Sequence, residues 1–390
     1  MTDSNATVSV DHIRFQQVFR FGSILKAIGT SLQPTRIGIA MFMLALLIGG
    51  GRLWDAAVGA GEEAHPPFDA TIVWVEGACE RIASGTIALN SAEFLGGTQD
   101  LLWGTTARLW DGGHMWFLLL FGLWTAAVTA LCGGVLCRLE AVHVATQDPA
   151  PLDPALDLAI TRWSAFFGAL LVPVVLAAVL AMGLILFGFI LFNVPLLNIL
   201  GGILYGLALL VGLGLTLLIL GFGVCYPLLL PAVAVENCDG PDALHRAIAY
   251  IVARPLAWIL YLITLALGLG LGLILVKTVG HWTIDATSGL VGLWTGGDTL
   301  SAASASLSGE EAPELGWTDQ WTSGLVAFWT SIVQWVIVGW AITYIMSAST
   351  RAYLLLRRSC DGMSESHIWW PGLTRGTLAP EPPADDSRNE

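Results

Sequence analysis

The most patterned polar residues of the chain lie in residues 231–255, whose sequence is PAVAVENCDGPDALHRAIAYIVARP. Glu236 closes an apolar run that contains Pro231, Arg246 follows, and Arg254 stands directly before Pro255. A carboxylate and a guanidinium held at the boundary of a low-dielectric region attract each other more strongly than on an open surface. The spacing therefore predicts an ion pair of Glu236 with Arg246 or with Arg254.

Residues 239–254 are predicted to form the helix that such a pair would hold against the rest of the molecule. Asp239 and Gly240 offer a cap, and Pro241 suits a first helical turn. The apolar side chains that follow share one helical face, with charged and polar ones on the other; they are Leu244, Ala247, Ile248, Ile251 and Val252. The helix is expected to stop at Arg254.

Other chemistry finds little support in the sequence. His65, His114 and His281 lie near acidic residues, but no H-E-x-x-H spacing or nucleophile elbow accompanies them. The six cysteines form no C-x-x-C pair. We therefore expect no catalytic residue, no metal site and no cofactor. The net charge of −13, without a basic patch, argues against a nucleic-acid partner.

The composition predicts which elements position these residues. Only 12% of the 390 residues are charged, about half the fraction in soluble proteins, and the mean hydropathy is +0.71. No charged residue occurs between Arg162 and Glu236, and a membrane crossing needs about 20 apolar residues. The run predicts a hairpin of two crossings. Asn193, Pro195 and Asn198 would either make its turn or unwind the backbone to line a conduit.

The predicted fold class is an all-α polytopic membrane bundle with amphipathic interfacial helices. The six predicted crossings are residues 37–54, 115–137, 164–192, 199–231, 256–276 and 324–346. Splitting residues 164–235 into three short crossings gives seven in total. That alternative would place Arg351, Arg357 and Arg358 on the opposite side of the membrane from the other cations, so it ranks lower.

Cation placement predicts the orientation. With six crossings, 13 of the 17 Lys and Arg residues lie on the same side of the membrane as the N-terminus. Only Arg52, Arg81, Arg108 and Lys277 lie on the other side. The positive-inside rule then puts both termini in the cytoplasm of a bacterium, across its inner membrane. Two acidic excursions, residues 55–113 and 277–323, would lie outside. The link after residue 137 would be cytoplasmic.

Three regions are expected along the chain. Residues 1–36 would form a cytoplasmic segment with an amphipathic helix over residues 11–32, residues 37–358 the membrane domain, and residues 359–390 a disordered cytoplasmic tail. Small residues spaced four apart, as in Gly202-x-x-x-Gly206, predict close helix packing, and Gly268-x-Gly270-x-Gly272 extends the pattern.

The order Pro231, Glu236, Arg246, Arg254-Pro255 resembles a signature of multi-pass membrane families of unknown role. It is similar to the membrane domain of some bacterial glycerophosphodiester phosphodiesterases and closer to uncharacterised planctomycete membrane proteins. The start of the chain, from Phe19-Arg20 to Trp54-Asp55, also resembles the planctomycete group. The resemblance covers about a quarter of the chain, and nothing in the sequence corresponds to the catalytic domain. It implies a fold and a location, not a reaction.

Together these features predict a non-catalytic scaffold or accessory subunit whose partners are the lipid bilayer and other membrane proteins or a second copy. The alternative is a passive channel or a transporter component. The predicted hydrocarbon region, which Arg36 and Arg52 bound in the first crossing, contains no Asp, Glu, Lys, Arg or His, which argues against a proton-coupled carrier.

Overall fold

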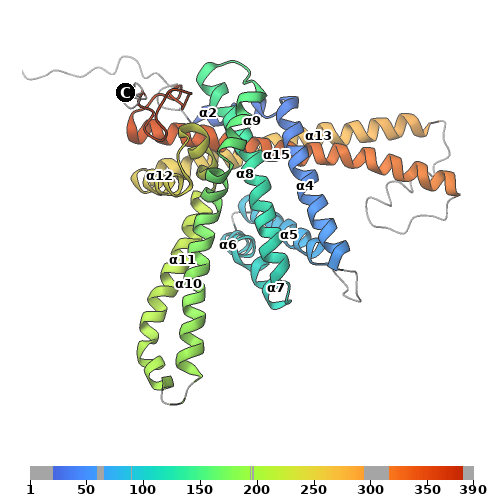
Figure 1. Cartoon of the computed structure of the whole chain (residues 1–390). Coiled ribbons are helices and arrows are strands. Elements are labelled where there is room, and N and C mark those ends of the chain that lie inside the picture. Colours follow the sequence, from blue (N-terminus) through green and yellow to red (C-terminus); the bar gives the residue numbers. More distant parts are fainter. Residues whose placement is uncertain are drawn as a thin grey trace, which may run out of the picture.

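The computed structural model describes residues 21–58, 66–88, 90–193, 195, 197–293 and 316–380. Within these residues the chain forms α-helices, one π-helical segment and turns, and the only β-pairing is a single bridge between Leu373 and Pro380. Figure 1 shows helices radiating from one crowded end of the molecule. The predicted all-α fold is confirmed.

Six helices are long and apolar enough to cross a membrane. They are α4 (Pro34–Val58), α8 (Met115–Thr146), α10 (Trp163–Phe192), α11 (Leu197–Glu236), α13 (Pro255–Gly292) and α15 (Trp317–Asp361). Each predicted crossing lies within one of them. Because α10 and α11 are each continuous, residues 164–235 form two helices rather than three. Length and composition thus make the chain a multi-pass membrane protein.

Several of these helices run further than their predicted crossings. The first part of the predicted link after residue 137 is helical, because α8 continues to Thr146. No proline or glycine interrupts residues 135–148, and the helix ends where Gln147 adopts the left-handed conformation (φ 64°). Both ends of the predicted second excursion are helical, since residues 277–292 belong to α13 and residues 317–323 to α15. Residues 294–315, including the Ser-rich tract 301–308, lie outside the described residues.

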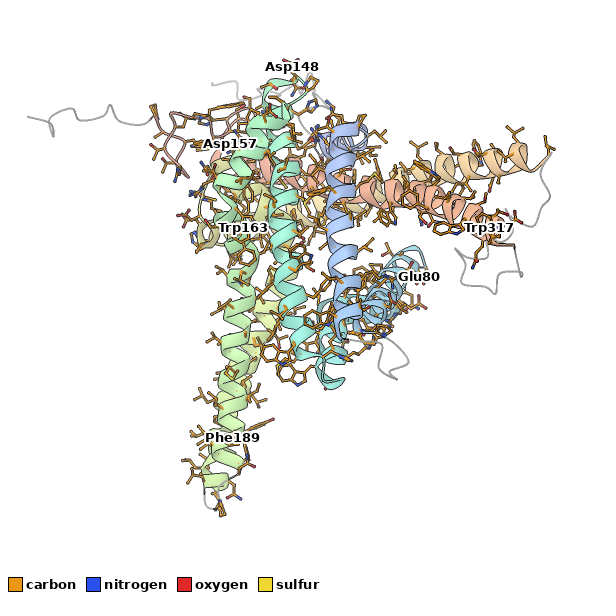
Figure 2. The ribbon with its side chains drawn as sticks, turned by 45° about the vertical axis from the view of Figure 1, so that its right-hand side comes forward. Glu80, Asp148, Asp157, Trp163, Phe189 and Trp317 are labelled. Atoms are coloured by element: carbon orange, nitrogen blue, oxygen red, sulfur yellow. The ribbon has the colours of Figure 1, made fainter. Side chains whose placement is uncertain are left out.

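The α10–α11 hairpin extends away from the rest of the molecule with apolar side chains exposed along its length. In Figure 2, Phe189 marks its far end, where the side chain is 68% exposed. The prediction that Gly202 and Gly206 pack closely against another helix is wrong, because a Cβ atom at either position would meet nothing within 4 Å.

Close glycine packing occurs instead in the second hairpin, made by α13 and α15. A Cβ atom at Gly268 would overlap the Tyr344 hydroxyl, and one at Gly272 would overlap the Trp340 ring. Glycine therefore admits these two aromatic side chains, which stack with centroids 5.4 Å apart. The Tyr344 hydroxyl donates to the carbonyl of Leu265 at 3.1 Å. This hairpin extends in a different direction from α10–α11 (Figure 1).

The first acidic excursion folds into short helices between α4 and α8. They are α5 (Pro67–Ile87), α6 (Ser91–Gln99), the π-helix η1 (Asp100–Gly104) and α7 (Thr105–Asp111). Asp100 pairs with Arg81 and, at 3.3 Å, with Arg108. Phe68, Leu109 and Phe117 make a small apolar cluster that joins these helices to the start of α8.

The main hydrophobic core surrounds α15, at the end of the molecule opposite the short helices of the first excursion. Every residue from Met346 to Arg357 is buried, so this part of α15 is enclosed on all sides. Around it gather α2 (Gly22–Leu25), α3 (Ala27–Thr30), α9 (Leu152–Thr161) and α12 (Gly240–Ala253), together with the ends of α8 and α11. We call this region, residues 21–36, 138–163, 236–255 and 347–380, the charged end.

The C-terminal part of the charged end is ordered. Residues 359–361 finish α15, Gly362 closes the helix in the left-handed conformation (φ 70°), and Ile368 is fully buried. The prediction of a disordered tail from residue 359 is therefore wrong as far as residue 380. Residues 381–390, and residues 11–20 of the predicted amphipathic helix, lie outside the described residues.

Candidate functional site

The end of α11 is the point on which distant parts of the charged end converge. The last carbonyls of any helix lack partners within that helix. Here four consecutive ones accept hydrogen bonds from residues far along the chain. The pairs are Ala234 O with Arg138 Nη1 (3.0 Å), Val235 O with Trp369 N (2.7 Å), Glu236 O with Gly376 N (2.9 Å) and Asn237 O with Arg162 Nη2 (3.4 Å). This capping explains why residues 369–376 are ordered.

The side chain of Glu236 is buried and fully occupied. Its Oε2 accepts from Nη1 of Arg246, and its Oε1 accepts from the Tyr353 hydroxyl at 2.6 Å. Nη1 of Arg357 lies 3.7 Å from Oε1, an ion pair beyond hydrogen-bond distance. Arg246 also donates to the carbonyl of Gly376 at 3.1 Å. Burial alone would lower the pKa of Arg246, but the Glu236 carboxylate raises it overall.

Of the two pairings predicted for Glu236, the structure contains the one with Arg246. Arg254 is exposed, and among the described residues its side chain donates only to the carbonyl of Ser359, at 3.4 Å. Pro231 lies inside α11 and is buried, and Pro255 is the first residue of α13. The predicted amphipathic helix is α12, which begins and ends close to the predicted limits.

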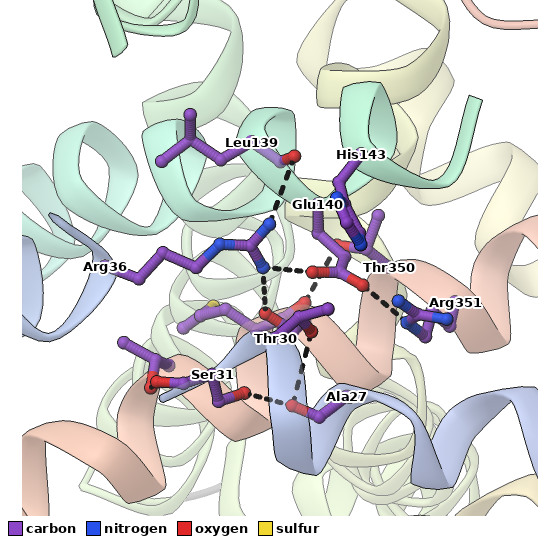
Figure 3. Close-up of polar contacts among 12 residues, drawn as sticks. Ala27, Thr30, Ser31, Arg36, Leu139, Glu140, His143, Thr350 and Arg351 are labelled. Atoms are coloured by element: carbon purple, nitrogen blue, oxygen red, sulfur yellow. Dashed lines mark hydrogen bonds and ion pairs between the residues drawn. The ribbon is translucent and has the colours of Figure 1, made fainter. Parts of the chain in front are cut away.

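A second buried carboxylate, Glu140, lies on α8 and is fully buried. Its Oε2 accepts from Nη1 of Arg36 and its Oε1 from Nε of Arg351. Figure 3 shows Glu140 between the two guanidinium groups. Arg36 also donates to the Ser347 hydroxyl at 3.0 Å, and Arg351 to the carbonyl of Ser23 at 3.2 Å. The cluster thus ties the start of α4 to α8 and α15.

Arg351 and Arg357, one in each cluster, both belong to the enclosed part of α15. A buried cation is tolerated only when it is paired and hydrogen-bonded. Glu140 and Glu236 supply that charge, because α8 and α11 both pack on α15. Sequence reasoning missed the Glu140 cluster, since it assigned Glu140 to a link. The signal was present in the unbroken stretch 135–148, which lets α8 carry Glu140 past the predicted membrane boundary.

Beside the end of α11 the charged end contains a pocket of about 420 Å³. Its walls come from α8, from the 147–151 turn, from α9 and from the C-terminal segment. The polar and aromatic residues among its lining are Arg138, Thr146, Asp148, Asp157, Thr161, Arg162, Asn237, Trp369, Trp370 and Arg375. The guanidinium of Arg138 lies 5.3 Å from the Trp370 ring centroid and 6.0 Å from that of Trp369. We call this the charged-end pocket.

The residues singled out in the hairpin lie at its turn. Asn193 follows the last residue of α10, and its side-chain amide donates to the carbonyl of Phe189 at 3.1 Å. Asn198 is in the first turn of α11. Pro195 lies between the two helices. The sequence left open whether these residues make a turn or unwind the backbone to line a conduit, and their positions are those of a turn.

Within the described residues, no group of three or more His, Cys, Asp or Glu side chains is placed to hold a metal ion. His65 lies outside those residues. The six cysteines are free thiols, and burial raises the pKa of the Cys238 thiol to about 12.

Comparison of the chain with protein-family models, curated proteins and solved structures finds no match. The resemblance to planctomycete membrane proteins and to the membrane domain of glycerophosphodiester phosphodiesterases therefore stays a prediction.

Proposed function

We propose that the protein is a non-catalytic scaffold or accessory subunit of a bacterial inner membrane. The observation that carries this proposal is the use of the buried acids. Glu140 and Glu236 are each paired with two arginines from other helices, so both serve to hold those helices together. The charged end is thereby a fixed platform from which apolar hairpins extend.

The hairpins support a role in binding lipid or other membrane proteins. Leu213 on α11 is 55% exposed and Ile203 is 73% exposed. Side chains of this kind need either acyl chains or an apolar partner surface around them. A second copy of the chain or another membrane protein is the partner that the scaffold role requires.

The orientation that accompanies this proposal puts the charged end and both termini in the cytoplasm. The arginines of the charged end support it, because positively charged residues favour the cytoplasmic side. A membrane-impermeant maleimide should label exposed Cys79 in intact cells and half-buried Cys360 only after lysis. Cys238 should stay unlabelled in both cases, because it is buried and the thiolate is the reactive form. Labelling of Cys360 in intact cells would contradict the orientation.

Photo-crosslinking tests the scaffold role itself. A photoreactive residue at Leu213 should give discrete adducts with protein in cells, whereas one at Leu229, which is fully buried on the same helix, should crosslink only within the chain. Liposomes with the purified protein should show no solute flux above empty vesicles. The scaffold proposal would be wrong, and a channel favoured, if the protein gave a flux that Asn193→Leu abolished without unfolding it and if no adduct formed at Leu213.

A further inference from the structure

The charged-end pocket has a size and a lining that suit a small polar ligand. Its volume of about 420 Å³ falls in the range of ligand pockets, about 300–1,000 Å³. Prolines at 149, 151, 154 and 371 form part of its wall and stiffen the backbone around it. The pocket is therefore a built cavity between three segments of chain, not a gap at the end of a single helix.

Three arginines in the lining of the pocket are suited to binding an anion. Arg138 is 5% exposed and donates to the carbonyls of Ala234 and Trp369, and no carboxylate of the described residues pairs with it. Arg375 likewise has no carboxylate partner in the described part of the chain. Arg162 is paired with Asp239 through Nη2, but its Nε is buried and makes no hydrogen bond with the described residues. Arginine matches phosphate oxygens in both charge and geometry.

Two carboxylates and an amide oxygen in the same lining are suited to binding a cation that donates hydrogen bonds. Asp148 and Asp157 line the same pocket from its exposed side, and neither pairs with a cation among the described residues. Figure 2 shows both at the same end of the molecule. Asn237 is 1% exposed, and its side-chain oxygen accepts no hydrogen bond from the described residues. A buried polar atom without a partner costs about 1–3 kcal/mol, which a bound donor would recover.

We propose that the charged-end pocket binds a phosphate ester that also carries an ammonium group, the chemistry of a zwitterionic phospholipid headgroup such as that of phosphatidylethanolamine. The phosphate lies against Arg138, Arg162 and Arg375. The ammonium faces Asp148, Asp157 and the Asn237 oxygen. A phosphate alone leaves Asp148 and Asp157 without a counter-charge, and an amine alone leaves Arg138 and Arg375 without one.

A membrane lipid is a natural source of this group. On α9, which forms one wall of the pocket, Leu156 and Ile160 are 39% and 58% exposed. Amphipathic helices with such apolar side chains lie at the headgroup level of a bilayer. Basic pockets at that level bind lipid headgroups. A soluble ester with the same two charges has the same recognition chemistry, so the test distinguishes the two sources.

The test uses the full chain, purified in detergent and depleted of lipid. Thermal stability and native mass spectrometry are measured with added phosphatidylethanolamine, with phosphatidylglycerol and with soluble glycerophosphoethanolamine. Phosphatidylethanolamine should raise the melting temperature and remain bound, with affinity well above that for phosphatidylglycerol. Binding of the soluble ester with equal strength would support the pocket and make the acyl chains dispensable. Weak binding of the soluble ester would support the lipid as its source.

Two variants of exposed pocket residues locate the binding. Arg375→Gln should weaken the binding of both lipids about tenfold, the effect of losing a charged hydrogen bond. Asp157→Asn should weaken the binding of phosphatidylethanolamine alone. Arg358→Gln is the matched control, because Arg358 pairs with Glu365 outside the pocket. Equal binding of the two lipids, no binding of any of the three probes, or wild-type binding by both variants would overturn the proposal.

Discussion

Glu140 and Glu236 occupy similar positions and differ in what they join. Each is buried beside α15 and each meets one arginine of that helix. The partners of Glu140 are nearly inaccessible, with Arg36 1% and Arg351 9% exposed. Around Glu236, Arg246 is 29% exposed and belongs to α12, which is not one of the six long apolar helices. The first cluster fastens membrane helices to one another, and the second fastens surface elements to them.

The comparison shows that the burial of an ion pair determines how much its loss costs in the free energy of unfolding. In a fully enclosed cluster, removing one charge strands the others in a low-dielectric region. In a cluster with a half-exposed member, water reaches that member and screens the loss. The two glutamates are therefore expected to respond differently to the same substitution.

The largest effect should come from Glu140→Gln. The change leaves two buried guanidinium groups without a counter-charge, which should cost about 3–5 kcal/mol in the free energy of unfolding. Thermal unfolding in detergent measures it. Asp69→Asn is the control, because the Asp69–Arg52 pair is 39% and 61% exposed and contributes about 0–1 kcal/mol. Equal melting temperatures for the two variants would show that the Glu140 cluster is open to solvent.

Glu236→Gln should cost less, about 3 kcal/mol, because Arg246 can turn toward water. Its distinctive result should be local. Arg246 links Glu236 to the Gly376 carbonyl, so the amides of Trp369 and Gly376 should exchange hydrogen faster. Arg254→Gln is the matched control and should change neither quantity. A larger loss of stability from Arg254→Gln than from Glu236→Gln would indicate that Glu236 pairs with Arg254 rather than with Arg246.

The smallest effect should come from Tyr353→Phe. It removes one hydrogen bond to Glu236 and keeps both ion pairs, so the expected cost is about 1.5–3 kcal/mol. Hydrogen exchange at Trp369 and Gly376 should stay close to the wild-type rate. Faster exchange as great as in Glu236→Gln would mean that the tyrosine, rather than the charge, holds Arg246 in place.

The sequence predicts the membrane helices well because their signal is local. A run of apolar residues long enough to span a bilayer identifies α10 and α11 without knowledge of any neighbour. The Glu236–Arg246 pair was also within reach, since both residues flank one short helix. Arg357 and Tyr353 were not, because their approach to Glu236 depends on how α15 packs.

The errors have a common physical cause. Charges at residues 138 and 140 suggested a solvated link, yet Arg138 donates to the carbonyls of Ala234 and Trp369 and Glu140 is paired with Arg36 and Arg351 from distant segments. The polar composition after residue 359 suggested disorder, yet residues 369–376 complete the hydrogen bonding of α11. Gly202 and Gly206 suggested a packed interface, but spacing alone does not say whether a partner helix is there. Composition reports the average environment of a segment and omits the specific partner that changes it.

The capping of α11 also bears on how the protein is made. Two of the groups that bind the last carbonyls of α11, the amides of Trp369 and Gly376, are synthesised well after the helix itself; Gly376 lies 130 residues beyond Arg246, which already follows α11. At a synthesis rate of about 5–20 residues per second, that interval is on the order of 10 s. During it the end of α11 has emerged while part of its hydrogen bonding is unmade, and only water can satisfy those carbonyls. Completion of the charged end is thus a late event in biosynthesis, after the hairpin it anchors has already been translated.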